Sequence, residues 1–175
     1  MAQRQYTYIA GDWDHDKNAV DILEYWRKQS KLKYLNAHDT KTAYDDSLNC
    51  SIKKSLKARI DISKRFVLIV GDHTDSVTAG GCQLCPSYNS YWKYCARGYS
   101  VDYDSFIKYE CKKADEAYAE GVMSIIVLYN STSVNKYLCP EALRYLGYHI
   151  PMIYKGYDGK LYWDYNAISK VFSQT

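Results

Sequence analysis

One glutamate of this 175-residue chain lies where a predicted helix turns its apolar face toward the protein interior. Residues three, four and seven apart share a helix face. This spacing groups five apolar residues into one stripe, namely Tyr103, Phe106, Ile107, Ala114 and Ala117. Glu110 falls within the stripe, about 20° from two of its members at the angular spacing of a helix. An inward carboxylate is costly without a partner or a use. Glu110 is therefore either paired with a Lys or Arg or functional.

A carboxylate near the ligand-binding edge of a sheet, among aromatic side chains and few cations, suits chemistry at a sugar carbon. A Glu can bind ribose hydroxyls and stabilise an oxocarbenium-like transition state, as carboxylates do in glycoside cleavage. Aromatic faces can stack on a nicotinamide or adenine ring, and helix N-termini can bind a pyrophosphate. The sequence contains no GxGxxG, GxxxxGK[ST] or GxSxG, so the common dinucleotide, P-loop and hydrolase motifs are absent.

Three cysteines, Cys82, Cys85 and Cys95, lie close together in the sequence. A CxxC pair can be half of a zinc site, and His73 or Cys95 could complete it. The second pair at matching spacing is missing, and the CxxC does not open a helix after a strand as a redox motif would. We therefore expect ordinary thiols, with no zinc and no other metal.

Composition and charge limit the classes of partner. Hydrophobic residues make up 47% of the chain, charged residues make up 25%, and the net charge is +3. This charge is too mild to indicate nucleic-acid or membrane binding, and no stretch approaches the roughly 20 apolar residues of a transmembrane helix. The first residues run into a strand pattern without the apolar core of a signal peptide. We expect a cytoplasmic protein with reduced cysteines.

Strand and helix patterns alternate along the chain, and the elements that they predict must position Glu110. Strands are predicted at 6–10, 32–36, 65–70, 122–129 and 148–154. Helices are predicted at 17–29, 47–60 and 141–146, and over the segment that carries Glu110. The alternation favours an α/β fold, with a parallel sheet of about five strands and helices on both faces. We expect one domain over 1–175, with an irregular insertion at 72–100 and a hairpin and helix at 156–175.

The carboxyl ends of parallel strands form the edge where ligands bind. The first strand ends there with four residues that could border a ligand: Ala10, Gly11, Asp12 and Trp13. His15 and His38 lie in loops at the same edge, and we expect their side chains to be solvated.

Parts of the sequence resemble TIR-like domains. YTYIAGDWDHDKNAVDILEYW resembles their opening strand and helix. FVLIVGDHTD and SFIKYECKKADEAYAEGVMSIIVLY resemble the third strand, catalytic helix and fourth strand of bacterial Thoeris-type TIR proteins. These proteins have an aromatic residue, usually Trp, four positions before the catalytic Glu, and here the pair is Phe106 and Glu110. The resemblance covers 6–128, except for the Cys-rich loop within 72–100.

The resemblance implies a flavodoxin-like TIR fold in three layers and an enzyme that breaks the nicotinamide–ribose bond of NAD. Such enzymes make a cyclic ADP-ribose-type signal that activates a partner effector in antiphage defence. NAD would then be a substrate rather than a cofactor, and self-association is implied as well. Glu110 would be the catalytic residue. The resemblance and the strand-end position together assign the substrate contacts to Ala10, Gly11, Asp12, Trp13, Asp39, Tyr44 and Phe106.

Two other functions fit the same pattern. A nucleoside deoxyribosyltransferase-like enzyme shares the sheet order and uses a Glu nucleophile, and Asp12, Asp39 and Asp72 could supply the further carboxylates that it needs. A non-enzymatic TIR or receiver-like interaction module would tolerate replacement of Glu110. A receiver domain would also have an Asp ending the third strand, whereas here Asp72 comes one position late.

Overall fold

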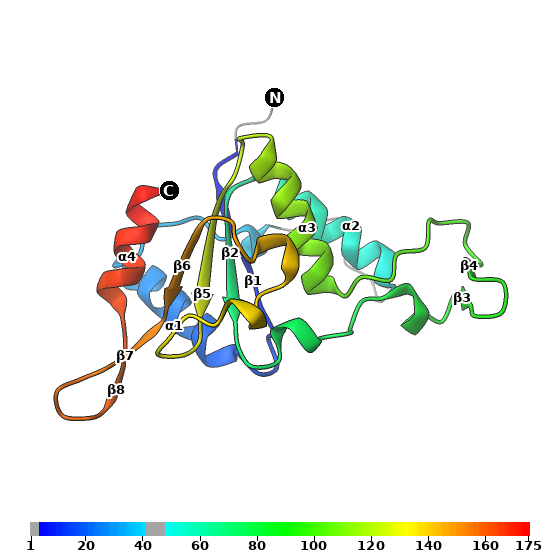
Figure 1. The fold of residues 1–175 in the computed structure, drawn as a ribbon. Coiled ribbons are helices and arrows are strands. Elements are labelled where there is room, and N and C mark those ends of the chain that lie inside the picture. Colours follow the sequence, from blue (N-terminus) through cyan, green and yellow to red (C-terminus); the bar gives the residue numbers. More distant parts are fainter. Residues whose placement is uncertain (1–3, 41–47) are drawn as a thin grey trace.

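A parallel sheet of four strands forms the centre of the molecule (Figure 1). The computed structural model describes residues 4–40 and 48–175. Within them the strand order is β1-β2-β5-β6. The bounds of these strands are Tyr6–Ala10 for β1, Ser63–Val70 for β2, Ser124–Tyr129 for β5 and Tyr148–Pro151 for β6. The predicted α/β fold with a parallel sheet is confirmed.

Two layers of helices cover the sheet, one on each face (Figure 1). The helices α1 (Lys17–Lys28) and α4 (Tyr165–Gln174) pack on one face, and α2 (Asn49–Asp61) and α3 (Phe106–Ala119) pack on the other. Side chains of a strand alternate between faces, so a strand covered on both sides must be apolar throughout. In the described residues, no helix has the length and apolar character needed to cross a bilayer.

The predicted strand at 32–36 was wrong. This segment makes one parallel bridge, between Asn36 and Thr7, and the backbone N–H of Thr7 donates to Leu35 O at 2.7 Å. The Asn36 side chain then accepts from the backbone N–H of His38 at 3.0 Å and caps the 3₁₀ turn η1 (Ala37–Asp39). Because the chain enters this turn at once, the segment leaves the edge of β1 after one bridge.

The predicted helix at 141–146 was also wrong, because this segment forms only the 3₁₀ turn η5 (Glu141–Leu143). The chain must then turn at Gly147, which has φ +74°, to enter β6. A Cβ at Gly147 would lie 2.2 Å from Ile125 O, so the turn requires glycine. The predicted last strand is split at Met152. Its second half, β7 (Ile153–Lys155), pairs with β8 (Leu161–Trp163) as a hairpin.

A long segment between β2 and α3 projects from the body of the molecule (Figure 1). It contains the turns η2 (Thr74–Ser76) and η3 (Cys82–Leu84) and a short hairpin of β3 (Tyr88–Asn89) and β4 (Tyr94–Cys95). Two backbone hydrogen bonds of 2.8 Å close its base, from Phe106 N to Ala79 O and from Cys82 N to Asp102 O. We call 79–82 together with 102–106 the neck.

Arg65 fastens the C-terminal helix to the sheet. Its side chain is buried, and it donates to Phe172 O at 2.8 Å, to Thr175 Oγ1 at 2.7 Å and to Thr7 Oγ1 at 3.3 Å. The guanidinium also lies over the Phe172 ring, 4.9 Å from its centroid. The cation therefore joins α4 to β1 and β2.

We expect Arg65→Ala to lower the free energy of unfolding by about 2–3 kcal/mol, because it leaves buried acceptors without their charged donor. Urea denaturation followed by circular dichroism measures this change. Lys64→Ala, at an exposed position of the same strand, is the control and should change stability by less than about 0.5 kcal/mol. An equal loss in both variants would contradict the anchoring role of Arg65.

Candidate functional site

Glu110 lies on the second turn of α3 and faces the sheet, as the helical spacing predicts. Its side chain is only 6% exposed. Tyr8, a fully buried residue in the middle of β1, donates its hydroxyl hydrogen to Glu110 Oε1. Among the described residues, the hydrogen-bond partner of Glu110 is thus a phenol rather than the Lys or Arg that a structural ion pair requires.

The helix face around Glu110 differs from the predicted stripe at its first member. Tyr103 precedes α3, is 52% exposed and shares a hydrogen bond of 3.0 Å with the Tyr88 hydroxyl. The helix begins only at Phe106, because the Ser105 side chain caps it by accepting from the Lys108 N–H at 3.2 Å. The buried residues beside Glu110 are Ile107, Cys111, Ala114 and Ala117.

Burial controls the ionisation of both partners. It raises the pKa of Glu110 to about 7, and the hydrogen bond from Tyr8 opposes that rise. Burial also raises the pKa of Tyr8 well above its ordinary value, so the phenol stays protonated and can only donate to the carboxylate. Near neutral pH, Glu110 therefore populates both protonation states, which suits a carboxyl group that takes part in chemistry.

A chain of aromatic contacts leads from Glu110 to the surface. The ring centroids of Tyr8 and His38 are 4.7 Å apart, and those of His38 and Trp13 are 5.7 Å apart. Burial lowers the pKa of His38, so the neutral ring donates from Nε2 to Ile9 O at 2.7 Å. Trp13 is 48% exposed. We call Glu110, Tyr8, His38 and Trp13 the aromatic path.

The expectation that His38 would be solvated was wrong, because its ring packs on Tyr8 and bonds to the backbone of β1. Sequence reasoning also missed Tyr8. Its period-2 position in YTYIA puts it on the same strand face as Ala10, so alternation along β1 could have found it. No sequence periodicity could have identified His38, because its position depends on the turn η1, which follows the bridge between Asn36 and Thr7.

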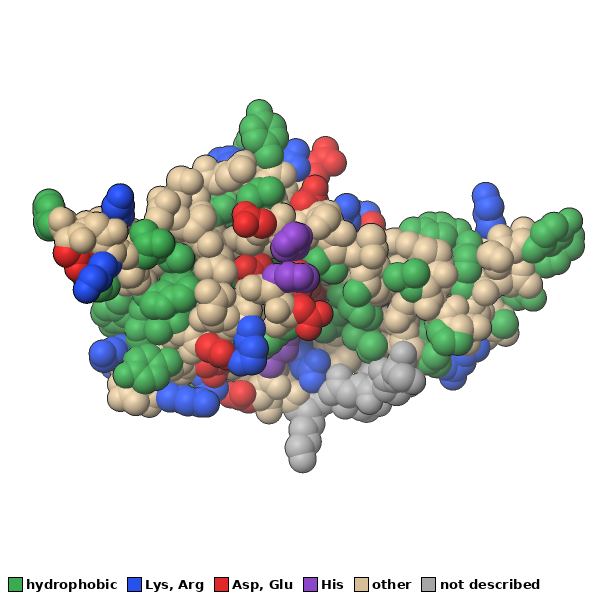
Figure 2. Space-filling model, turned by 90° about the horizontal axis from the view of Figure 1, so that it is seen from below, with side chains coloured by type: hydrophobic (Ala, Val, Ile, Leu, Met, Phe, Trp, Pro, Cys, Tyr) green, Lys and Arg blue, Asp and Glu red, His purple; other side chains and the backbone are tan. Residues whose placement is uncertain are grey.

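The four residues at the end of β1 lie at the carboxyl edge of the sheet, as predicted. Ala10 and Gly11 are buried backbone positions, whereas Asp12 accepts a hydrogen bond from His15 Nδ1 at 2.7 Å. Burial opposes ionisation of Asp12, but the bonds from His15 and the backbone hold its pKa below the ordinary value. The His15 ring lies 4.5 Å from that of His73. Figure 2 shows histidine and acidic side chains gathered near the middle of this face.

The remaining predicted contacts have separate surroundings. The Asp39 carboxylate pairs with Arg27 at 2.8 Å, and its side chain is 59% exposed. Phe106 is four residues before Glu110 on α3 and packs at the neck, where a Cβ at Gly80 would lie 2.6 Å from its ring. Tyr44 lies outside the described residues.

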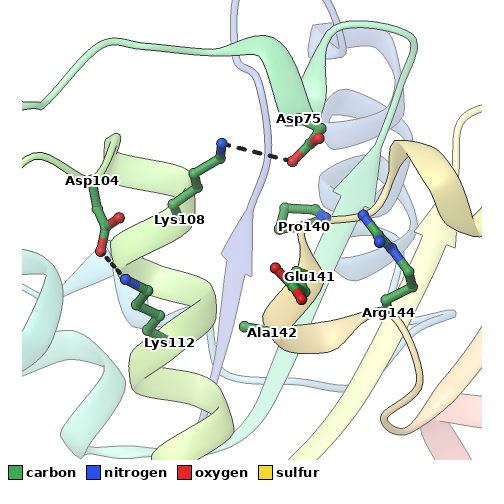
Figure 3. A pocket seen from close by; sticks show the side chains of 8 residues that line it. All are labelled: Asp75, Asp104, Lys108, Lys112, Pro140, Glu141, Ala142 and Arg144. Atoms are coloured by element: carbon green, nitrogen blue, oxygen red, sulfur yellow. Dashed lines mark hydrogen bonds and ion pairs between the residues drawn. The ribbon is translucent and has the colours of Figure 1, made fainter.

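A cavity of about 310 Å³ lies on another side of α3, next to η5 (Figure 3). Its cations are already engaged. Lys112 pairs with Asp104 at 2.5 Å, Lys108 lies 3.9 Å from Asp75, and Arg144 donates to Cys139 O at 3.1 Å. This mixed lining does not define an anion site, and Glu110 is not part of it. In the described part of the chain, no three His, Cys, Asp or Glu side chains already converge as metal ligands.

Comparison with known proteins adds one result. No protein-family model and no curated protein matches the chain. Among solved structures, it is similar to a metazoan TIR-STING receptor from C. gigas, determined in complex with 2',3'-cGAMP, with a TM-score of 0.50 and 12% sequence identity. The match covers 99% of this chain and 40% of that chain. At this identity the likeness shows the fold alone, and the fold of this chain is TIR-like.

Folding raises the pKa of Glu110 from 4.5 to about 7. The folded state therefore holds a proton that the unfolded chain releases, and this contribution to stability is lost as pH rises through that interval. We expect wild type to lose about 3 kcal/mol of unfolding free energy relative to Glu110→Gln between about pH 4.5 and pH 8. Urea denaturation across this range measures the difference.

The control is Glu116→Gln, whose side chain lies on the same helix and is 60% exposed. This variant should follow the pH dependence of wild type. A constant difference in stability between wild type and Glu110→Gln at every pH would show that folding does not shift the pKa of Glu110.

Proposed function

We propose that the chain is a TIR-type enzyme that cleaves the nicotinamide–ribose bond of NAD, with Glu110 as its catalytic residue. The observation that carries this proposal is the inward carboxyl of Glu110, which has a pKa of about 7 and is bonded to Tyr8 within a TIR-like fold. A fold alone hosts many functions, so the argument depends on this carboxyl and on the aromatic path that connects it to the surface.

In the proposed reaction, the bond between the ribose C1′ and the nicotinamide nitrogen breaks, and its electron pair leaves with nicotinamide. Positive charge then develops on the ribose, and the ionised carboxylate of Glu110 would stabilise it. Tyr8 holds Oε1 of Glu110, so we assign Oε2 to the ribose. The exposed ring of Trp13 offers a face for stacking a base of the substrate.

The ribose cation must be captured by a nucleophile. Water would give ADP-ribose, whereas an atom of the ADP-ribose moiety itself would give a cyclic product. From the sequence resemblance to Thoeris-type proteins, we propose a cyclic ADP-ribose-type signal that activates a partner effector in antiphage defence, produced by self-associated chains. The cyclic dinucleotide ligand of the structural neighbour belongs to that receptor, and we do not transfer it to this chain.

One observation favours a non-enzymatic interaction module instead. Glu110 is 6% exposed and bonded to Tyr8, an arrangement that a purely structural residue could also have. The deoxyribosyltransferase alternative has less support. The pKa of Glu110 responds to burial and to Tyr8, and Asp12, Asp39 and Asp72 do not contribute to its shift.

Nicotinamide release from NAD tests the proposal. We expect lysate of cells that express the wild type to release nicotinamide, with phage infection as the trigger, and Glu110→Gln to lower the rate by at least about 100-fold, since it removes the charge that stabilises the transition state. Glu116→Gln should keep the wild-type rate. Mass spectrometry identifies the product, and a mass equal to that of cyclic ADP-ribose supports cyclisation.

If NAD survives in wild type with and without infection, the interaction module becomes the better description. Exchange of free bases on deoxynucleosides, measured in the same lysates, would instead identify the transferase.

The pH profile of kcat/KM gives a second test. Because the ionised carboxylate is the proposed active form, activity should rise with pH through about 7. Tyr8→Phe removes the hydrogen bond that lowers the pKa of Glu110, so its rise should begin at higher pH. A profile with the same midpoint in wild type and Tyr8→Phe would contradict the role of Tyr8 as the donor to Glu110.

A further inference from the structure

Four free cysteines surround one small cavity at the base of the projecting segment. Cys82 and Cys85 come from η3 and the residue after it, Cys95 comes from β4, and Cys50 comes from the first turn of α2. The cavity they line has a volume of about 10 Å³. The body of the domain and the projecting segment therefore both contribute thiols to one small cavity.

The projecting segment has little else to hold its shape. Its hairpin has two residues in each strand, and an isolated two-stranded hairpin is at best marginally stable in water. Its large apolar side chains are mostly in solvent: Leu84, Tyr91, Trp92, Tyr94 and Tyr99. Small units without a core of their own usually depend on a cross-link or a metal, and such a link would add to the contacts that hold the neck to α2.

A short 3₁₀ turn brings the two cysteines of the CxxC together. Cys85 N donates to Cys82 O at 2.9 Å, and this bond closes the turn between the two residues of the CxxC. Asp102 N donates to Cys82 Sγ at 3.2 Å, which fixes the position of that sulfur beside the neck. Two cations, Lys54 and Arg97, lie over the ring of Tyr99, which also lines the cavity. Positive charge therefore lies beside a ring that lines the cavity.

We propose that Cys50, Cys82, Cys85 and Cys95 bind one structural zinc ion. Thiolates are the ligands that soft metal sites use, and four cysteines make a closed tetrahedral zinc site with no position for substrate. The sequence pattern offered Cys82 and Cys85, with His73 or Cys95 to complete an incomplete set, and the fold adds Cys50. The cavity has about the volume that a single small occupant needs.

The thiols reach their ligand positions when the metal binds. In the described residues, no three His, Cys, Asp or Glu side chains are placed to hold a metal ion, so the proposal requires these thiol side chains to rotate. Each Cys side chain rotates about a single torsion, and zinc binding removes the thiol protons and draws the sulfurs to about 2.3 Å from the ion. The bound ion would fasten the projecting segment to α2, next to the neck. This role does not depend on NAD cleavage.

Metal analysis of the full-length protein tests the proposal. After growth in zinc-supplemented medium, we expect plasma mass spectrometry to find about one zinc ion per chain, released by a mercurial that reacts with thiols. Cys50→Ser and Cys82→Ser should each lose most of the zinc. Cys139→Ala removes a buried cysteine that does not line this cavity, and it should retain the wild-type content.

A second measurement uses wild type only, in case the serine variants do not fold. Cobalt added to metal-free protein should give the intense near-ultraviolet absorption of thiolate coordination and the visible bands of a tetrahedral site. Wild-type protein with less than about 0.1 zinc per chain and no cobalt spectrum would overturn the proposal. So would zinc that stays at the wild-type level in folded Cys50→Ser, or disulfide bonds among these four cysteines in freshly purified protein.

Discussion

A buried carboxyl group can stay in a protein core only if the surrounding structure gives it a donor, and here Tyr8 provides that donor for Glu110. The Tyr8 ring stacks on Phe66, with centroids 5.5 Å apart and planes 4° from parallel. These two residues are register partners in the pairing of β1 with β2. A shift of one residue in this register would replace the Tyr8 side chain with that of a neighbour facing the other layer. The ionisation of Glu110 therefore depends both on the register of β1 with β2 and on the packing of α3 against the sheet.

The same arrangement links the free-energy cost of burying Glu110 to the pKa of its carboxyl group. Desolvation disfavours the charged form of Glu110, and the packing of the sheet and its two helix layers must offset that cost. The hydrogen bond from Tyr8 reduces it without removing it, which leaves the pKa near neutrality. Burial lowers the pKa of His38, so its ring packs against Tyr8 without adding a charge there. Burial in the layer of α2 and α3 thus determines the pKa of the Glu110 carboxyl, the group proposed to act on the substrate.

The parts of the fold that the sequence predicted are those determined by local periodicity. The apolar run of β2, the strand after α3 and the inward direction of Glu110 all follow from spacing along one element. The predictions that were wrong share a cause: each depended on contacts between residues that are far apart in the sequence. The bridge at Asn36 ends because of the turn that follows it. The segment after Pro140 stays a short 3₁₀ turn because the chain must turn at Gly147, with φ +74°, to enter β6. His38 and Cys50 became candidates only when folding brought Tyr8 and the CxxC beside them.

The neck has a consequence for how this protein can diversify. Hydrogen bonds between Ala79 and Phe106 and between Cys82 and Asp102 fix both ends of the projecting segment at the start of α3. The chain between them is a closed loop, and the entropic cost of lengthening such a loop grows only slowly, by about 0.6 kcal/mol for each doubling. Residues beyond the neck, other than the proposed zinc ligands Cys85 and Cys95, can therefore be inserted, deleted or exchanged while Glu110 keeps its place on α3. The length and composition of the projecting segment and the reactivity of the core are, in this architecture, separately evolvable traits.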